Sequence, residues 1–156
     1  MTLTTPRAAA SAVALALLAV PALAFALVTG TCRGTWDLPG TASIGSANGV
    51  LVDASGQQAF QMDVQLQATP TPGLFDAGTF FGSLDDGSGA AFPQYGVSGT
   101  YVGSTLAQSG LFRGVITRQV SPKGPIAIIG RIKGQYADPE VFPSNGTFTG
   151  QWTANL

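Results

Sequence analysis

The stretch GTFTGQW, residues 146–152, contains a large apolar side chain that lies two positions from a glycine on either side. The same pattern occurs as GTFFG at 78–82, GTYVG at 99–103, GLFRG at 110–114 and GRIKG at 130–134. Residues two apart in a strand share a face, so each bulky group lies between glycines on one face of a sheet. In a small closed barrel, this alternation lets an aromatic ring lie over the glycine of a neighbouring strand. The repeat therefore predicts the inner wall of a barrel.

Alternation of apolar and polar residues continues outside the repeat. AFQMDVQLQA at 59–68 places Phe60, Met62 and Val64 on one face, and PIAIIGRIKGQY at 125–136 does the same with Ile126, Ile128 and Ile132. The dipeptides Asn48-Gly49 and Asn145-Gly146 are typical of tight hairpin turns. The sequence predicts an all-β fold, a small antiparallel meander β-barrel in one Gly-rich domain over 33–156. Its eight expected strands are 33–44, 49–54, 58–69, 74–84, 94–103, 108–120, 125–136 and 145–155.

The first thirty residues differ from the rest. After Arg7 comes an apolar run rich in Ala, Leu and Val that ends in Ala22-Leu23-Ala24, which fits the recognition rule of signal peptidase. We expect a signal peptide over 1–24, a short linker over 25–32, and export to the periplasm, the cell envelope or the extracellular space. Two alternatives are an uncleaved membrane anchor over 8–28 and a lipid attached to Cys32. Cys32 is the only cysteine, which excludes an intramolecular disulfide.

Most groups that support catalysis are missing. The chain has no histidine, so it lacks the commonest general base and metal ligand. We therefore predict no enzymatic activity, no cofactor and no metal site. Asp85-Asp86 is interpreted as turn chemistry rather than a calcium site, and the pair Ser121 and Lys123 as a solvated turn rather than a catalytic dyad. Asp138 and Glu140 flank a proline in a loop, and Asn145-Gly-Thr147 matches a glycosylation sequon.

The charges are few and unevenly placed. Seven basic and eight acidic residues predict no nucleic-acid partner. Five basic residues fall within 108–136, where there is no acid. A turn centred on Pro122-Lys123 places Arg113 opposite Lys133, with Arg131 diagonal to Arg113, and like charges that face each other destabilise a sheet. We interpret Arg113, Arg131 and Lys133 as a small cationic surface for an anionic partner, an envelope polysaccharide or a lipid headgroup. The alternative is that an acid on an adjacent strand, or water, offsets the charges.

Two short resemblances agree with the barrel. Gly34-Thr35-Trp36 resembles the Gly-x-Trp that opens the first strand of lipocalin and avidin-type barrels, over about a dozen residues. The avidin-type start has an asparagine two residues after the tryptophan, where this chain has Leu38. The Gly-x-Phe-x-Gly strands are similar to the barrel lobes of transferrin-binding surface lipoproteins. These resemblances imply a barrel and carry over no ligand-contact residue.

These features together predict an exported, non-enzymatic β-barrel module of the cell envelope or extracellular space that binds an anionic partner through the basic 108–136 hairpin. One alternative is an eight-stranded outer-membrane barrel, whose apolar face meets lipid while its Gln, Thr and Arg face fills the lumen. Another is a lipocalin-like carrier of a small apolar ligand. Such a carrier needs a void of several hundred Å³, which we would expect to be lined by Trp36, Phe80, Tyr101, Phe112 and Trp152. Membrane association and oligomeric state are left open.

Overall fold

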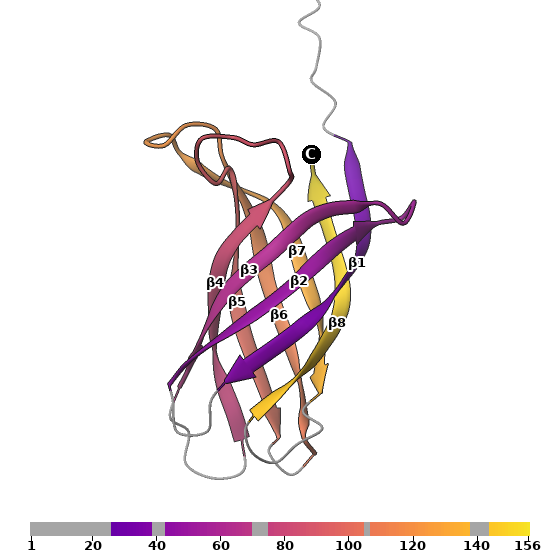
Figure 1. The fold of residues 1–156 in the computed structure, drawn as a ribbon, viewed down its shortest axis with the longest axis vertical. Helices are drawn as coiled ribbons and strands as arrows, with labels where there is room; N and C mark the ends of the chain where they lie inside the picture. The colour runs from indigo at the N-terminus through magenta and orange to yellow at the C-terminus, as the bar shows by residue number, and fades with distance from the viewer. Residues whose placement is uncertain (1–25, 39–42, 70–74, 105–106, 138–143) are drawn as a thin grey trace, which may run out of the picture.

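The computed structural model describes residues 26–38, 43–69, 75–104, 107–137 and 144–156. They form eight antiparallel strands in which each strand pairs with the next and β8 pairs back with β1, so the sheet closes into a barrel (Figure 1). The predicted all-β meander barrel is confirmed. The strands are β1 (Leu27–Leu38), β2 (Ile44–Asp53), β3 (Gln58–Ala68), β4 (Phe75–Asp85), β5 (Tyr95–Ser104), β6 (Ser109–Gln119), β7 (Ile126–Ala137) and β8 (Ser144–Asn155).

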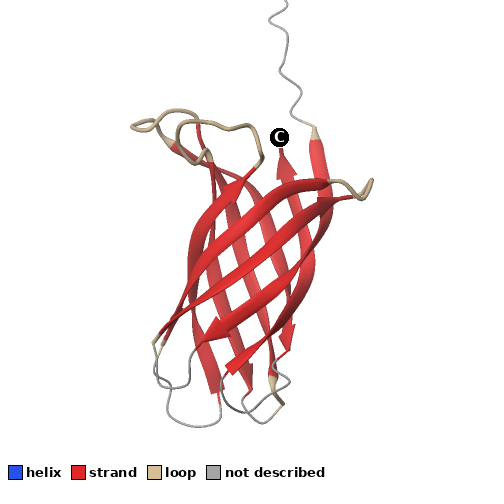
Figure 2. Cartoon of the chain, in the orientation of Figure 1, coloured by secondary structure: helices blue, strands red, loops and turns tan. Residues whose placement is uncertain are grey.

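Strands and loops account for all the described structure (Figure 2). Within these ranges there is no helix with the length and hydropathy needed to cross a membrane. We call the end of the barrel at which the C-terminus lies the upper end, as drawn in Figure 1. The start of β1 and the turns β2–β3, β4–β5 and β6–β7 lie at this end.

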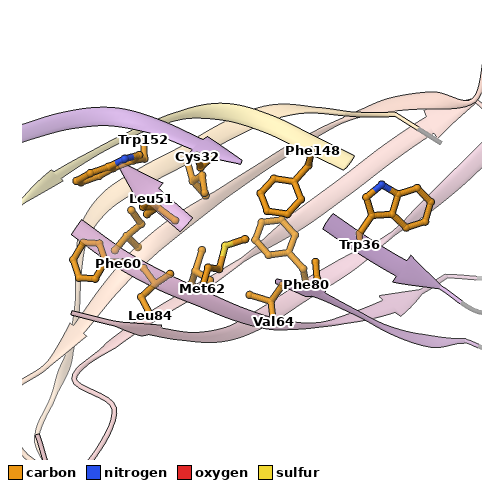
Figure 3. Packing of buried hydrophobic residues seen from close by; sticks show 14 of the residues in the cluster. Cys32, Trp36, Leu51, Phe60, Met62, Val64, Phe80, Leu84, Phe148 and Trp152 are labelled. Carbon is orange, nitrogen blue, oxygen red and sulfur yellow. The ribbon is translucent and has the colours of Figure 1, made fainter. Parts of the chain in front are cut away.

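The apolar face of the sheet points inward. On β3, Phe60, Met62 and Val64 are buried, while Gln61 and the other polar residues between them are exposed. Figure 3 shows the upper interior filled by side chains such as Trp152, Leu51 and Phe60. Among the described residues, no polar or charged side chain is buried. A barrel with this polarity is stabilised by the burial of apolar side chains in its interior, and the charged side chains that the structure describes lie on the outer wall or in the turns.

Aromatic rings lie over inward-facing glycines, as the repeat predicts. Phe80 pairs with Gly99, which in turn pairs with Gly114, and a Cβ at these two glycines would lie 2.6 Å and 2.8 Å from the ring Cζ of Phe80. Tyr136 covers Gly103 and Gly110 in the same way. One ring thus covers a row of two glycines from successive strands. The absent side chains make the room that the rings fill, which allows eight strands to close around a packed interior.

The two tryptophans lie toward opposite ends of the interior (Figure 3). The indole Nε1–H of Trp152 donates to the carbonyl of Val52 at 3.1 Å, and that of Trp36 donates to the carbonyl of Ala137 at 3.3 Å. Each buried N–H therefore has a backbone acceptor, as expected for tryptophan in a core.

Two Asn-Gly dipeptides were wrongly predicted to form turns. The dipeptides Asn48-Gly49 and Asn145-Gly146 lie within β2 and β8 rather than in turns. Gly49 and Gly146 face inward, where a Cβ would meet the Phe148 ring and the Trp36 indole. Close packing, rather than a positive φ, accounts for these glycines. The first strand accordingly ends at Leu38 and begins at Leu27, so most of the expected linker over 25–32 belongs to β1.

Candidate functional site

The three cations predicted as a binding surface lie together on the outer wall of β6 and β7. Arg113 is directly opposite Lys133, and Arg131 lies one row higher, opposite Val115. All three side chains are exposed. The predicted register is therefore confirmed. We call these three residues the cationic face.

Neighbouring strands supply no counter-charge to the cationic face. In the same rows, Arg113 is flanked by Thr100 on β5, and Lys133 is flanked by Gln151 on β8. Neither β5 nor β8 contains an acidic residue. No ion pair joins the cationic face to a carboxylate within the described ranges. The alternative of an offsetting acid on an adjacent strand is therefore wrong, and the alternative that water offsets the charges stays untested.

Arg118, also on β6, is separate from the cationic face. Its guanidinium carbon lies 5.5 Å from the ring centroid of Tyr95, its partner in the β5–β6 pairing. The Tyr95 ring in turn packs edge-on against Phe60 in the core. Arg118 also makes the weakest of the contributions that lower the pKa of Asp86, where the largest is the hydrogen bond from Ser88. Arg118 therefore has a structural cation–π contact at the upper mouth.

Above the cationic face, the hairpin carries apolar residues that are exposed. Val120, Ile126 and Ile128 are 75%, 65% and 69% exposed. The prediction that Ile126 and Ile128 line the inner wall with Ile132 is wrong. The register shifts between Ile116 and Thr117, so Ile129 is an extra residue in β7 that packs partly against the core. A bulge of this kind reverses the alternation, which turns Ile126 and Ile128 outward.

The acidic and hydroxyl candidates act as turn residues. Asp85 and Asp86 each accept a backbone hydrogen bond from the residue two positions later, at 2.8 Å and 3.0 Å. Ser121 and Lys123 are exposed in the β6–β7 turn, where the Ser121 carbonyl accepts from Gly124 N–H at 2.9 Å. Within the described ranges, no three His, Cys, Asp or Glu side chains lie close enough to share a metal ion. Asp138 and Glu140 lie outside the described residues.

The lower interior contains an apolar cavity of about 60 Å³. This volume is well below the several hundred Å³ expected of a carrier, and below the roughly 150 Å³ of an engineered cavity that binds benzene. Trp152 does not line it, because that side chain fills the upper half of the barrel. Six aromatic residues contribute to its wall: Trp36, Phe80, Tyr101, Phe112, Tyr136 and Phe148.

Cys32 lies on the inner face of β1, and only 1% of its surface is exposed. Burial raises the pKa of its thiol to about 12, which a smaller backbone hydrogen-bond effect opposes. A protonated thiol enclosed by packed side chains is neither nucleophilic nor open to attachment of a lipid. The folded barrel therefore has no space for a lipid beside the Cys32 side chain. The expected signal peptide over 1–24 lies outside the described residues.

Comparison with known proteins finds no family model, no curated protein and no solved structure that matches this chain. The functional argument therefore depends on the residues of this chain itself.

Proposed function

We propose that this protein is an exported, non-enzymatic barrel module that binds an anionic partner through Arg113, Arg131 and Lys133. The observation that carries the proposal is the exposed pair of like charges formed by Arg113 and Lys133, with no acid on either flanking strand. Like charges directly opposite in a sheet destabilise it. An anion bound across the pair would remove that repulsion and add charge-assisted hydrogen bonds.

The spacing of the cations suggests the form of the partner. Residues directly opposite have Cβ atoms about 5 Å apart, and diagonal neighbours about 7–8 Å apart. Long side chains on such a grid fit a partner with several anionic groups at similar spacing, such as sulfates, phosphates or uronates. Arginine also binds planar or tetrahedral oxyanions through two parallel hydrogen bonds. The expected ligand is therefore a polyanionic surface or polymer rather than a single small anion.

The polar outer wall supports a module in water over the membrane-barrel alternative. An outer-membrane barrel has an apolar band facing lipid. Here most of the large apolar side chains face inward, and those that are exposed, among them Phe81, Val102 and Leu111, are interspersed with polar residues. The outer wall between β7 and β1 carries mainly Thr, Gln and Arg, including Gln151, Thr153 and Arg33. The carrier alternative gains no support from a cavity of about 60 Å³. The non-enzymatic assignment is supported by the absence of histidine and by the buried, protonated Cys32.

Binding to immobilised dextran sulfate tests the proposal. In the test variant, Arg113, Arg131 and Lys133 are each replaced by serine. The control variant carries Gln61→Glu, Gln65→Glu and Gln67→Glu, which change the net charge by the same amount on exposed positions of β3, across the barrel from β7. We expect the test variant to lose at least about tenfold in affinity, while the control stays within about threefold of wild type. If both variants lose the same affinity for dextran sulfate, the net charge of the protein explains the binding, and the proposal of a localised site is wrong.

A further inference from the structure

We propose that the anionic partner is a lipid membrane, and that the apolar tip of the β6–β7 hairpin inserts into its interface. This inference depends on the proposed function, because it names the partner of the same cationic face. The apolar tip is defined as Val120, Ile126 and Ile128. Each of these β-branched side chains leaves about two thirds or more of its surface in water. A cluster of exposed aliphatic groups on one hairpin marks an interaction surface.

The tip overhangs the closed wall of the barrel. β7 pairs with β8 only from Gly130 onward, whereas its pairing with β6 continues to Ile126. Residues 126–129 therefore lie beyond the β7–β8 pairing, with β6 as their partner. Figure 1 shows the β6–β7 turn projecting outward at the upper end. A hairpin in this position is among the parts of the barrel that can first reach a surface at the upper end.

The bulge at Ile129 places apolar and cationic groups on one outer face. Ile126 and Ile128 lie nearest the turn, followed by Arg131 and then Lys133 opposite Arg113. At about 3.3 Å per residue, Arg131 lies about 10 Å from Ile128 along the strand. The polar headgroup layer is roughly 5–7 Å thick on each side of the hydrocarbon, and a long arginine side chain spans the difference. The arrangement fits aliphatic groups below the headgroups and guanidinium groups among the phosphates.

A membrane accounts for both features of the hairpin, whereas a polysaccharide accounts only for the charges. An anionic polymer in water gives no role to three exposed aliphatic side chains. Lipid phosphates complement the cations, and the acyl region accommodates the aliphatic groups.

Acidic residues at the upper end define the orientation of docking. Asp53, Asp85 and Asp86 lie at the β2–β3 and β4–β5 turns. An end-on approach would bring these carboxylates to the lipid phosphates and be repelled. Docking on the outer wall of β6 and β7 lets the apolar tip and the cationic face touch the surface together and avoids the end-on approach. The inferred orientation is therefore tilted: the hairpin is lowest, the outer wall of β6 and β7 faces the surface, and the lower end of the barrel is lifted away from it.

Co-sedimentation with vesicles tests the inference on the full chain. The vesicles contain phosphatidylcholine alone or phosphatidylcholine mixed with phosphatidylglycerol, and dextran sulfate is the lipid-free polyanion. The tip variant is Ile126→Ser with Ile128→Ser. Its matched control is Val102→Ser with Leu111→Ser, which removes aliphatic groups that are 54% and 64% exposed on the lower outer wall. Every variant retains the same N-terminal segment, so differences between variants report on the barrel.

We expect wild type to bind the mixed vesicles more tightly than phosphatidylcholine alone. The tip variant should lose roughly 10- to 100-fold in affinity for the mixed vesicles, from the lost aliphatic burial, yet bind dextran sulfate as wild type does. The matched control should bind both the mixed vesicles and dextran sulfate as wild type does. All four aliphatic positions are exposed, so folding is not at risk, and thermal unfolding checks this.

Other outcomes would overturn the lipid inference and locate the error. If wild type binds dextran sulfate but neither kind of vesicle, the cationic face stands and the lipid partner is wrong. If the tip variant binds mixed vesicles as wild type does, the tip does not insert. If the tip variant binds mixed vesicles as wild type does but has a lower molar mass than wild type in light scattering, the tip is a surface for a second copy of the chain. If the variant with serine at Arg113, Arg131 and Lys133 keeps its affinity for dextran sulfate, the proposed function itself fails.

A fluorescence measurement tests insertion separately from affinity. An environment-sensitive dye is attached to Ile128→Cys or, as the control, to Leu111→Cys. Labelling is selective because Cys32 is buried and its thiol is protonated. We expect dye emission at position 128 to rise and shift to the blue with mixed vesicles, and emission at 111 to stay unchanged. No change at 128 while the protein is vesicle-bound would exclude insertion of the tip.

Discussion

The ring of Phe148 lies against Gly34, its cross-strand partner in the β1–β8 pairing, and extends over Gly49 on β2. A Cβ at Gly34 would lie 2.6 Å from two ring atoms of Phe148 and closer still to the carbonyl of Asn48. The backbone carbonyl cannot move without disturbing the β1–β2 pairing. The contact therefore depends on the absence of a side chain.

Replacement of Gly34 by alanine should destabilise the barrel by about 1–3 kcal/mol, because overpacking in a core displaces rings and backbone. The measurement is the free energy of unfolding in denaturant. Ser98→Val is the control, since it adds bulk at an exposed position of β5 and should change that free energy by less than about 0.5 kcal/mol. An unaffected Gly34→Ala protein would contradict the packing role given to the repeated glycines.

How far the sequence predicts this fold depends on the residue considered. Phe60, Met62 and Val64 alternate with polar residues through a regular strand, so their direction follows from the pattern. Ile126 and Ile128 have the same alternation with Ile132, yet the bulge at Ile129 reverses them. No residue type in IAIIG identifies the bulge, because it arises from the pairing with β6 and the closure of the barrel. The apolar tip could therefore not be predicted from the sequence.

The cationic face could be predicted from the sequence, because no bulge interrupts the alternation there. Arg113 and Lys133 lie on the regular side of the bulge, where the turn centre fixes the register. The dipeptide Asn48-Gly49 led to a wrong prediction, because a glycine can serve either a turn or a close contact with an aromatic ring. Only the position of the Phe148 ring over Gly49 shows that this glycine serves the contact. Local chemistry thus predicted the barrel, while tertiary packing decided its boundaries.

The buried thiol makes stability depend on alkaline pH. Its pKa is about 12 in the folded protein against an ordinary value of 9.0, so above pH 9 the unfolded chain loses a proton that the folded protein keeps. The free energy of unfolding should then fall by about 1.4 kcal/mol per pH unit, relative to a Cys32→Ala variant. The comparison of the two slopes cancels other alkaline groups. Parallel slopes between pH 9 and pH 11 would show that the thiol ionises normally in the fold.

The lower cavity should accept a methylene group that the upper core cannot. Val64 lines the cavity of about 60 Å³, so Val64→Ile should raise the free energy of unfolding by up to about 0.8 kcal/mol. Val97 is buried outside the cavity lining, and Val97→Ile should lower it by about 1–3 kcal/mol. Both free energies come from denaturant unfolding. A stabilised Val97→Ile protein would mean that the upper half is less tightly packed than we infer.

Replacement of Lys133 by glutamate should separate stability from binding. The substitution places an acid directly opposite Arg113 and two residues along β7 from Arg131, so the free energy of unfolding should rise by about 0.2–1 kcal/mol at low salt. The gain should shrink as salt screens the exposed pair. Affinity for dextran sulfate should fall at least about tenfold, because two cations then face an internal acid.

Lys123→Glu is the control for net charge, because Lys123 lies in the β6–β7 turn without a cation paired opposite it. It changes the charge by the same amount and should leave the free energy of unfolding within about 0.5 kcal/mol of wild type. A Lys133→Glu protein that is no more stable than wild type would show that water already neutralises the repulsion between Arg113 and Lys133. The cationic face would then be an ordinary solvated surface, and the reason to assign it a partner would disappear.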